Sequence, residues 1–294
     1  MDSTLVIALL AGLGGMLGWG SADFFAKNAI DRIGPIKSLV WAHIFGTLVL
    51  LTVFLVQLIT GHNGAFANNL SSWLGLAGLG SLQMVVYYLA YLGFEKGKVS
   101  ILNPIFASYS GVVALIAIVF LHEKASWLSA LALLLIFFAN LALNMEFGAK
   151  RGRFKLTPGV IEVSAAAVLA AIWTLSWDHF VNGRDPVTSA LTMYAFMTVA
   201  ALLLAKFMHE AVKGTGGGVR KYLFLMGLGE AVAYLSISWG FSRTPLTGIV
   251  ALVSGAFSVP TIILAYVFLK ERLSRAQWLS IAGIVAGVVL LSIS

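Results

Sequence analysis

One acidic residue interrupts a long apolar stretch in the last third of the chain. Glu230 stands between Gly229 and Ala231, and Tyr234, four residues later, falls on the same face of a helix. Inside a bilayer an ionisable side chain costs about 2.5–3.5 kcal/mol on insertion scales, so an acid in such a stretch predicts a functional site. We interpret Glu230 as a carboxylate that binds a cationic substrate or exchanges a proton. A protonated side chain bonded between helices is the alternative.

Two further ionisable residues lie in apolar stretches. Asp23 follows Trp19 by one helical turn, and a cation can rest on the indole face while the carboxylate holds it, a contact worth about 0.5–2 kcal/mol. The alternative is a surface pair between Asp23 and Lys27. His43 can relay protons near neutral pH, which makes it a second coupling candidate beside Glu230, although a lone buried histidine often serves packing. No acid stands near His43 in the sequence, and no metal site is predicted.

Aromatic side chains in the inner parts of two other apolar stretches suggest how a solute could be held. Tyr87 belongs to a polar stripe with spacing i, i+4, i+8, and Trp173 is followed by another tryptophan one turn later. Such rings also form belts at membrane surfaces. With Trp19 and Tyr234, they could form an aromatic box for an amine or an aromatic side chain.

Proline and small polar residues mark two more stretches. Asn103 precedes Pro104 and is either a ligand for substrate or a helix cap. Ser258 lies two residues before Pro260, and Ser110 lies 148 positions before Ser258, so the two serines could face each other. Proline leaves a carbonyl of the preceding turn unbonded, which bends a helix or exposes a polar group. We therefore predict that Pro104 and Pro260 act in gating.

The composition explains why these residues are conspicuous. Of 294 residues, 60% are hydrophobic and 11% are charged, and the mean hydropathy is +0.94. Soluble domains carry about 25% charged residues, so a soluble chain is excluded and a polytopic membrane protein is predicted. Long continuous apolar runs favour helices over a β-barrel. The absence of cysteine excludes disulfides and thiol chemistry, and the net charge of +7 is attributed to loops and not to nucleic-acid binding.

Ten apolar runs are long enough to cross a bilayer, which predicts an all-α membrane protein. The first run begins almost at Met1 without a basic leader, so it is read as a retained helix and not a signal peptide. The predicted spans are 4–27, 36–60, 73–94, 98–121, 126–146, 158–180, 187–209, 220–241, 245–269 and 275–293.

The basic residues predict an orientation. Of 19 Lys and Arg residues, all but Lys124, Arg184 and Arg243 fall in or beside connectors that follow odd-numbered spans. Cytoplasmic loops are enriched in such residues, so these connectors should face the cytoplasm and both termini the outside. We expect a multi-pass protein of the inner membrane of a prokaryote.

The chain repeats itself. The segment Val119-Phe-Leu-His-Glu-Lys124 recurs 148 residues later as Val267-Phe-Leu-Lys-Glu-Arg272. The predicted repeats are residues 1–148 and 149–294, each with five spans. Because five is odd, the second repeat must enter the membrane in the opposite orientation. Inverted repeats are typical of transporters, whose substrate sites lie near the midplane between the repeats.

Two five-helix halves whose fourth spans end in a Phe-Leu-x-Glu-Lys/Arg turn resemble the drug/metabolite transporter superfamily, in particular its ten-helix EamA-type branch. The resemblance covers nearly the whole chain. It implies a central cavity lined by spans 1, 3, 4, 6, 8 and 9, peripheral spans 5 and 10, and alternating access for small metabolites or amphipathic cations. It also implies cytoplasmic termini, whereas the charge count of this chain indicates the reverse.

The first hypothesis is therefore a secondary transporter, most simply an exporter of amino acids or amines. An uptake carrier for a quaternary ammonium compound is the alternative, and an ion channel is a third reading from another class. No phosphate-binding loop or nucleophile–base pattern is present, so neither ATP drive, a cofactor nor an enzyme is predicted. The partners are a small solute, the bilayer and a coupling proton. The Gly283-x-x-x-Gly287 spacing suits packing within the chain or between two copies.

Overall fold

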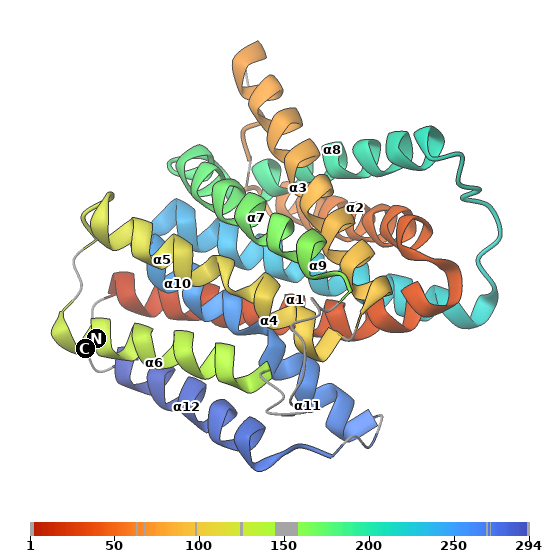
Figure 1. The fold of residues 1–294 in the computed structure, drawn as a ribbon. Helices are drawn as coiled ribbons and strands as arrows, with labels where there is room; N and C mark the ends of the chain where they lie inside the picture. The colour runs from red at the N-terminus through yellow and green to blue at the C-terminus, as the bar shows by residue number, and fades with distance from the viewer. Residues whose placement is uncertain are drawn as a thin grey trace.

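The computed structural model describes residues 3–62, 64–67, 69–97, 99–123, 126–144, 158–268, 270 and 272–292 (Figure 1), and helices are the only regular secondary structure in this part of the chain. The helices are α1 (Ser3–Ile33), α2 (Pro35–Ile59), α3 (Leu70–Lys96), α4 (Val99–Ala107), α5 (Tyr109–Val119), α6 (Trp127–Asn144), α7 (Val160–Val181), α8 (Pro186–Phe207), α9 (Gly217–Arg243), α10 (Thr247–Ser254), the 3₁₀ turn η1 (Gly255–Phe257), α11 (Ser258–Phe268) and α12 (Arg275–Ser292).

The ten predicted spans are confirmed as helices. Seven of the observed helical segments are long and apolar enough to cross a bilayer, and the remaining three spans contain the shorter apolar helices Ile105–Val119, Trp127–Ala139 and Arg275–Leu291. The fourth span consists of α4 and α5, and the ninth of α10, η1 and α11. The predicted boundary between the repeats, at residue 148, lies outside the described residues, as do the bases of that connector.

Local sequence signals explain where two of the helices begin. Asn69 caps α3 by accepting a hydrogen bond from the backbone N–H of Ser72 at 2.8 Å, and Asp185 caps α8 in the same way. The predicted end of the first span at residue 27 is wrong, because α1 continues to Ile33. The chain reverses only at Gly34, whose φ of 78° suits glycine.

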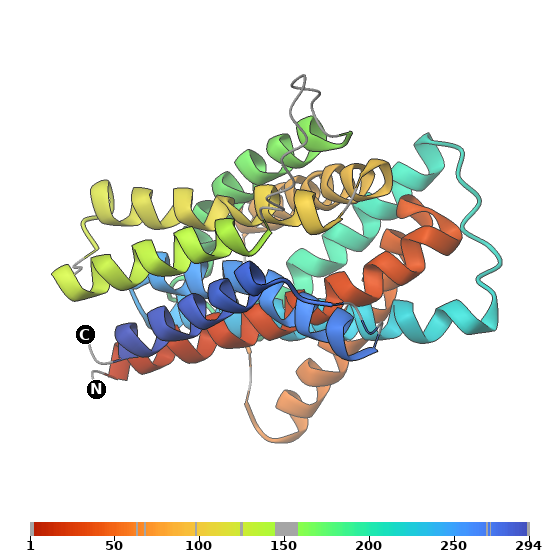
Figure 2. The same cartoon turned by 60° about the horizontal axis from the view of Figure 1, so that its bottom comes forward.

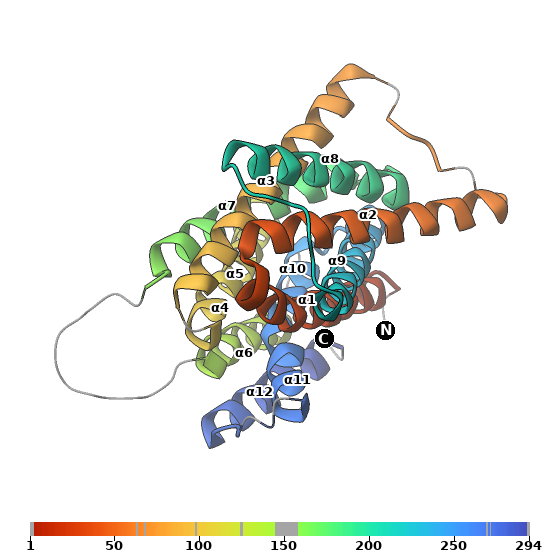
Figure 3. The same cartoon turned by 90° about the vertical axis from the view of Figure 1, so that its right-hand side faces the viewer.

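Helices of one half of the chain pack directly on helices of the other half, so the two halves do not form separate bundles. Helix α1 lies along α9, and its equivalent in the second half, α7, lies along α3; α2 packs on α8, and α6 packs on α12. Figure 2 shows the two ends of the chain together at one end of the bundle. Figure 3 shows α6 and α12 at its edge, away from α2 and α8, which agrees with the peripheral place implied for spans 5 and 10.

Glycine permits the closest of these contacts. A Cβ atom on Gly18 would lie 2.6 Å from the backbone oxygen of Gly229, so α1 and α9 touch backbone to backbone. In the last span, a Cβ on Gly283 would lie 3.0 Å from the Cβ of Ala139 in α6. Of the two uses considered for the Gly283-x-x-x-Gly287 spacing, the structure shows packing within the chain.

Spans 4 and 9 are broken at equivalent places. The helix of span 4 is interrupted at Ser108 and that of span 9 at Ala256, which has φ −77° and ψ 20° and lies 148 positions later. Pro260 explains the second break, because it offers no N–H to the carbonyl of Ala256. The bend expected before Pro104 is not where span 4 breaks. Ser108 lies one turn after that proline, and its hydroxyl takes the carbonyl of Ile105 at 2.7 Å, competing with the helical bond.

Candidate functional site

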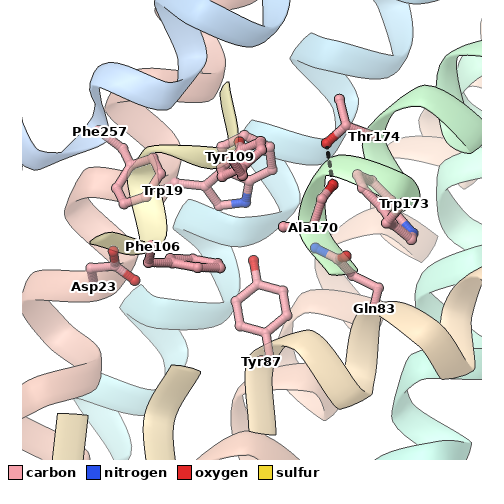
Figure 4. Close-up of a pocket in the computed structure, with 10 residues that line it drawn as sticks. All are labelled: Trp19, Asp23, Gln83, Tyr87, Phe106, Tyr109, Ala170, Trp173, Thr174 and Phe257. Atoms are coloured by element: carbon pink, nitrogen blue, oxygen red, sulfur yellow. Dashed lines mark hydrogen bonds between the residues drawn. The ribbon is translucent and has the colours of Figure 1, made fainter. Parts of the chain in front are cut away.

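A pocket lies between the two halves at the level of these breaks (Figure 4). Its cavity volume is about 20 Å³, so a solute of amino-acid size can enter only if helices move apart. The walls come from α1, α3, α4, α5, α7 and η1, which belong to five of the six spans implied by the resemblance. The lining residues are Trp19, Asp23, Gln83, Tyr87, Phe106, Tyr109, Ala170, Trp173, Thr174 and Phe257.

Asp23 is the acidic residue that lines this pocket. Its Oδ2 accepts a hydrogen bond from Asn103 Nδ2 at 3.0 Å, and the hydroxyl of Ser258 donates to Asn103 Oδ1 at 2.7 Å. This chain of bonds joins spans 1, 4 and 9. The alternative pairing of Asp23 with Lys27 does not occur, because Lys27 bonds to Asp31 at 2.6 Å. Within the described part of the chain, no basic residue forms an ion pair with Asp23.

Two buried polar atoms of the pocket residues have no protein partner among the described residues. They are the indole nitrogen of Trp19, a donor, and the amide oxygen of Gln83, an acceptor. A buried group left without a hydrogen bond costs about 1–3 kcal/mol. Figure 4 shows the indole nitrogen of Trp19 and the hydroxyl of Tyr87 directed into the space between the walls. The pocket therefore offers one free donor and one free acceptor in addition to the Asp23 carboxyl group.

Glu230 lies in a second, fully buried group, which we call the Glu230 cluster: Glu230, Tyr194, Tyr91 and His43. Tyr194 donates its hydroxyl to Glu230 Oε2 at 2.5 Å, and Tyr91 donates to Oε1 at 3.4 Å. The Nε2 atom of His43 lies 3.6 Å from Oε2. The carboxylate is thus surrounded by groups that donate or exchange protons.

His43 is oriented by its own helix. Its Nδ1 lies 2.8 Å from the carbonyl oxygen of Leu39, so a neutral ring has its hydrogen on Nδ1 and directs a free Nε2 lone pair toward Glu230. The inference that no acid lies beside this histidine is wrong in the folded chain. The acid belongs to α9, which is distant in sequence, so the residues around His43 could not predict this contact.

Tyr234 joins the pocket to the Glu230 cluster. Its hydroxyl accepts a hydrogen bond from Gln83 Nε2 at 2.8 Å and bonds to Tyr87. Its ring lies 5.4 Å from that of Tyr194, and the rings of Trp19 and Trp173 meet it edge-on at 5.8 and 5.6 Å. Tyr234 and Glu230 share a helix face as predicted, but each bonds to other helices.

The remaining predicted site residues do not all make the contacts that were expected of them. Ser110 and Ser258 each bond elsewhere, Ser110 to the carbonyl of Ala107 and Ser258 to Asn103, so the expected face-to-face pair is not formed. Asn103 lies within α4 and its side chain does not cap a helix. Pro260 is buried, and the side chain of Pro104 lies outside the described residues.

Sequence reasoning missed several members of the site, chiefly Tyr194, Tyr109 and Phe257. For Tyr194 a weak signal existed, because Thr198 follows it by one turn and makes that face of α8 polar. Aromatic residues are too common in apolar helices to be singled out. Among the described residues, no group of three or more His, Cys, Asp or Glu side chains could hold a metal ion.

Comparison with known proteins adds two findings. The model of the EamA-like transporter family matches the chain twice, over residues 6–145 and 157–293. A solved crystal structure of another protein is similar with a TM-score of 0.77 and 17% identity, covering 97% of this chain and 98% of that one, which shows a shared fold. No match was found among curated proteins.

Proposed function

The chain belongs to the EamA-like transporter family, and we propose that it moves small organic solutes bearing an amine across the membrane by alternating access around the Asp23 pocket. The family match covers both halves of the chain and makes it a multi-pass membrane transporter and not an enzyme. The two matches also agree with two inverted repeats of five spans. The solute and the direction of transport are the parts that we propose.

The observation that supports an amine is the set of free groups around the pocket. Asp23 is a buried acid without a basic partner among the described residues, and aromatic rings surround it. A cation both neutralises the acid and binds to ring faces. The free amide oxygen of Gln83 accepts a hydrogen bond, and a protonated amine has N–H groups to give.

The same atoms distinguish the two solute classes under consideration. A quaternary ammonium group has no N–H to donate to the oxygen of Gln83, whereas a solute with N–H groups can donate to it. The free indole N–H of Trp19 can donate to the carboxylate of an amino acid. We therefore favour amino acids and amines, with quaternary ammonium compounds second. Export is proposed from the family resemblance.

The Glu230 cluster supports a coupling role for a proton. Charge is costly inside a membrane, and no Lys or Arg side chain is bonded to Glu230 among the described residues, so the acid needs a proton or a cation. Tyr234 links this cluster to the pocket through Gln83 and Tyr87. We propose that proton exchange at Glu230, with His43 as a relay, is tied to solute binding at Asp23.

Transport in proteoliposomes tests the solute class. Labelled amino acids, a primary amine and choline are offered to the wild-type protein and to Asp23→Asn, with Asp31→Asn, an exposed acid, as the matched control. We expect saturable flux of an amine or amino acid that falls at least about tenfold in Asp23→Asn, because a charge-assisted contact is worth about 1.5–3 kcal/mol. Equal flux in both variants would show that Asp23 does not bind the solute.

A further inference from the structure

One position of the repeated Phe-Leu-x-Glu segment has the same backbone conformation in both halves. His122, in the first copy, has φ 54°, and Lys270, 148 positions later, has φ 55°. Left-handed backbone is uncommon for residues other than glycine and is retained where the surrounding structure requires it. In each copy a glutamate follows directly, Glu123 and Glu271. The same left-handed conformation also occurs at His209, before the exposed Glu210, so it is the repeated sequence that relates the two acids.

Glu123 binds the start of span 9. Its Oε2 accepts a hydrogen bond from the backbone N–H of Gly248 at 2.7 Å, and the N–H of Ile249 also donates to its carboxylate. These groups belong to the first turn of α10, where the helix dipole favours negative charge. Burial raises the pKa of Glu123, and the two backbone donors partly oppose that shift. The contact ties the end of the α5 segment to the beginning of α10.

The contact is close, and a second acid lies beside it. A Cβ atom on Gly248 would lie 3.0 Å from Glu123 Oε2, so even alanine would press on the carboxylate. Asp178, from the end of α7, bonds to the side chain of Thr247. Three segments, the turn after α5, the end of α7 and the start of α10, therefore meet at this point.

Spans 4 and 9 pack together more tightly at one end than at the other. Helices α5 and α10 pack closely, whereas α4 and α11 make only slight contact. Under the 148-residue offset of the repeats, α5 corresponds to α11 and α10 to α4. The two pairs are therefore the same interface at opposite ends of the pathway. It is closed at the Glu123 end and loose at the end where Lys270 lies.

We propose that Glu123 is a latch that holds the pathway closed at its end in this conformation, and that Glu271 is the matching latch in the opposite conformation. By the repeat, the partner of Glu271 is the backbone N–H of Ser100, at the start of span 4, as Gly248 is for Glu123. Only one latch is engaged at a time, because α5–α10 and α4–α11 close alternately. This inference concerns gating and does not depend on which solute is carried.

Thiol labelling tests the proposal directly, because the chain has no cysteine. Ser110→Cys places one thiol in a fully buried position on α5, against Gly255. A membrane-impermeant maleimide is added on the Glu123 side of proteoliposomes. His62→Cys, exposed in a connector on that side, calibrates the orientation of the protein and the reactivity of a free thiol.

Combined with Ser110→Cys, Glu123→Gln should raise the labelling rate about tenfold, because a charge-assisted bond becomes a weaker neutral one. Glu271→Gln should lower the rate, since it weakens the opposite conformation. Glu210→Gln, an exposed acid, should leave it unchanged. Gly248→Ala should raise the rate without altering the acid, and Gly216→Ala, where a Cβ meets nothing within 4 Å, is its control.

Folding of each variant is checked by size-exclusion chromatography and by its thermal unfolding midpoint. If Glu123→Gln does not fold, Glu123→Asp takes its place, because the Cβ in Gly248→Ala would also meet Ala114 and Ala117 of α5 at 3.3 Å. An unchanged labelling rate in folded Glu123→Gln or Gly248→Ala would overturn the latch at this end. A higher labelling rate in both Glu123→Gln and Glu271→Gln would also overturn the proposal. Alternating latches predict opposite changes in the two variants, whereas a general loosening of the protein predicts a rise in both. Flux is not measured, so failure of the proposed solute class would leave these outcomes untouched.

Discussion

At the scale of single residues, the chemistry of Glu230 comes from side chains of other helices. Its two carboxylate oxygens accept hydrogen bonds from Tyr194 on α8 and Tyr91 on α3. His43 on α2 faces one of these oxygens. Tyrosine hydroxyls stabilise a carboxylate without neutralising it, so the site can lose and regain a proton as long as the hydroxyls stay in place. The geometry suits an exchangeable acid better than a permanent ion pair.

Replacing Tyr194 by phenylalanine tests this view of the acid. The change removes the shorter bond to Glu230 and keeps the ring contact with His43, so loss of a charge-assisted bond of about 1.5–3 kcal/mol is expected. We predict a fall of about tenfold in proton-driven flux, measured in proteoliposomes, with the protein still folded. Tyr266→Phe, on the exposed face of α11, should behave as wild type. Equal flux in both variants would mean that the Tyr194 bond has no part in coupling.

The sequence singled out some of these residues and not others for a physical reason. Glu230 and Asp23 were visible because an acid in an apolar run is expensive wherever it points. Tyr194 and His43 were not assigned to Glu230, because a contact between helices leaves no local spacing to read. The free indole N–H of Trp19 could be found only from three-dimensional packing. Their roles in binding and coupling stay predictions.

At the scale of helices, glycine contacts decide how closely the two halves approach. Helices α1 and α9 touch at Gly18 and Gly229, and each would meet the backbone of the other if it had a Cβ atom. In a membrane, where burial of apolar surface adds little between helices, such close packing stabilises the bundle. The ten spans were predictable from run length alone. The break at Ser108 was not, because it depends on a side-chain bond within the helix.

Two alanine substitutions of opposite sign test the glycine contact. Gly18→Ala should destabilise the protein by about 1–3 kcal/mol, because the Cβ would press on backbone atoms of α9. Gly78→Ala, in the exposed middle of α3 with nothing within 4 Å, should be neutral or stabilising by up to about 1 kcal/mol. Thermal unfolding in detergent measures both. If Gly18→Ala unfolds at the wild-type temperature or above it, the close contact does not limit the packing of α1 on α9.

At the scale of the whole molecule, the inverted repeat makes one chain into two similar halves that need not be in the same state. The equivalent pairs α5–α10 and α4–α11 differ in how tightly they pack. Such asymmetry is what alternating access requires, since exchange of the two arrangements opens the other end. The repeat and its inversion could be inferred from one six-residue match and an odd number of spans. Which of the two helix pairs packs more tightly could not be predicted from the sequence, because both copies have the same motif.

The most direct test of the account is pH-driven accumulation of an amine by Glu230→Gln in proteoliposomes. The wild-type protein and the exposed control Glu210→Gln should concentrate the solute against its gradient when a proton gradient is imposed. Glu230→Gln, which keeps the shape but cannot release a proton, should only equilibrate it. Accumulation by Glu230→Gln at the wild-type level would contradict the central claim that this buried acid couples proton exchange to transport.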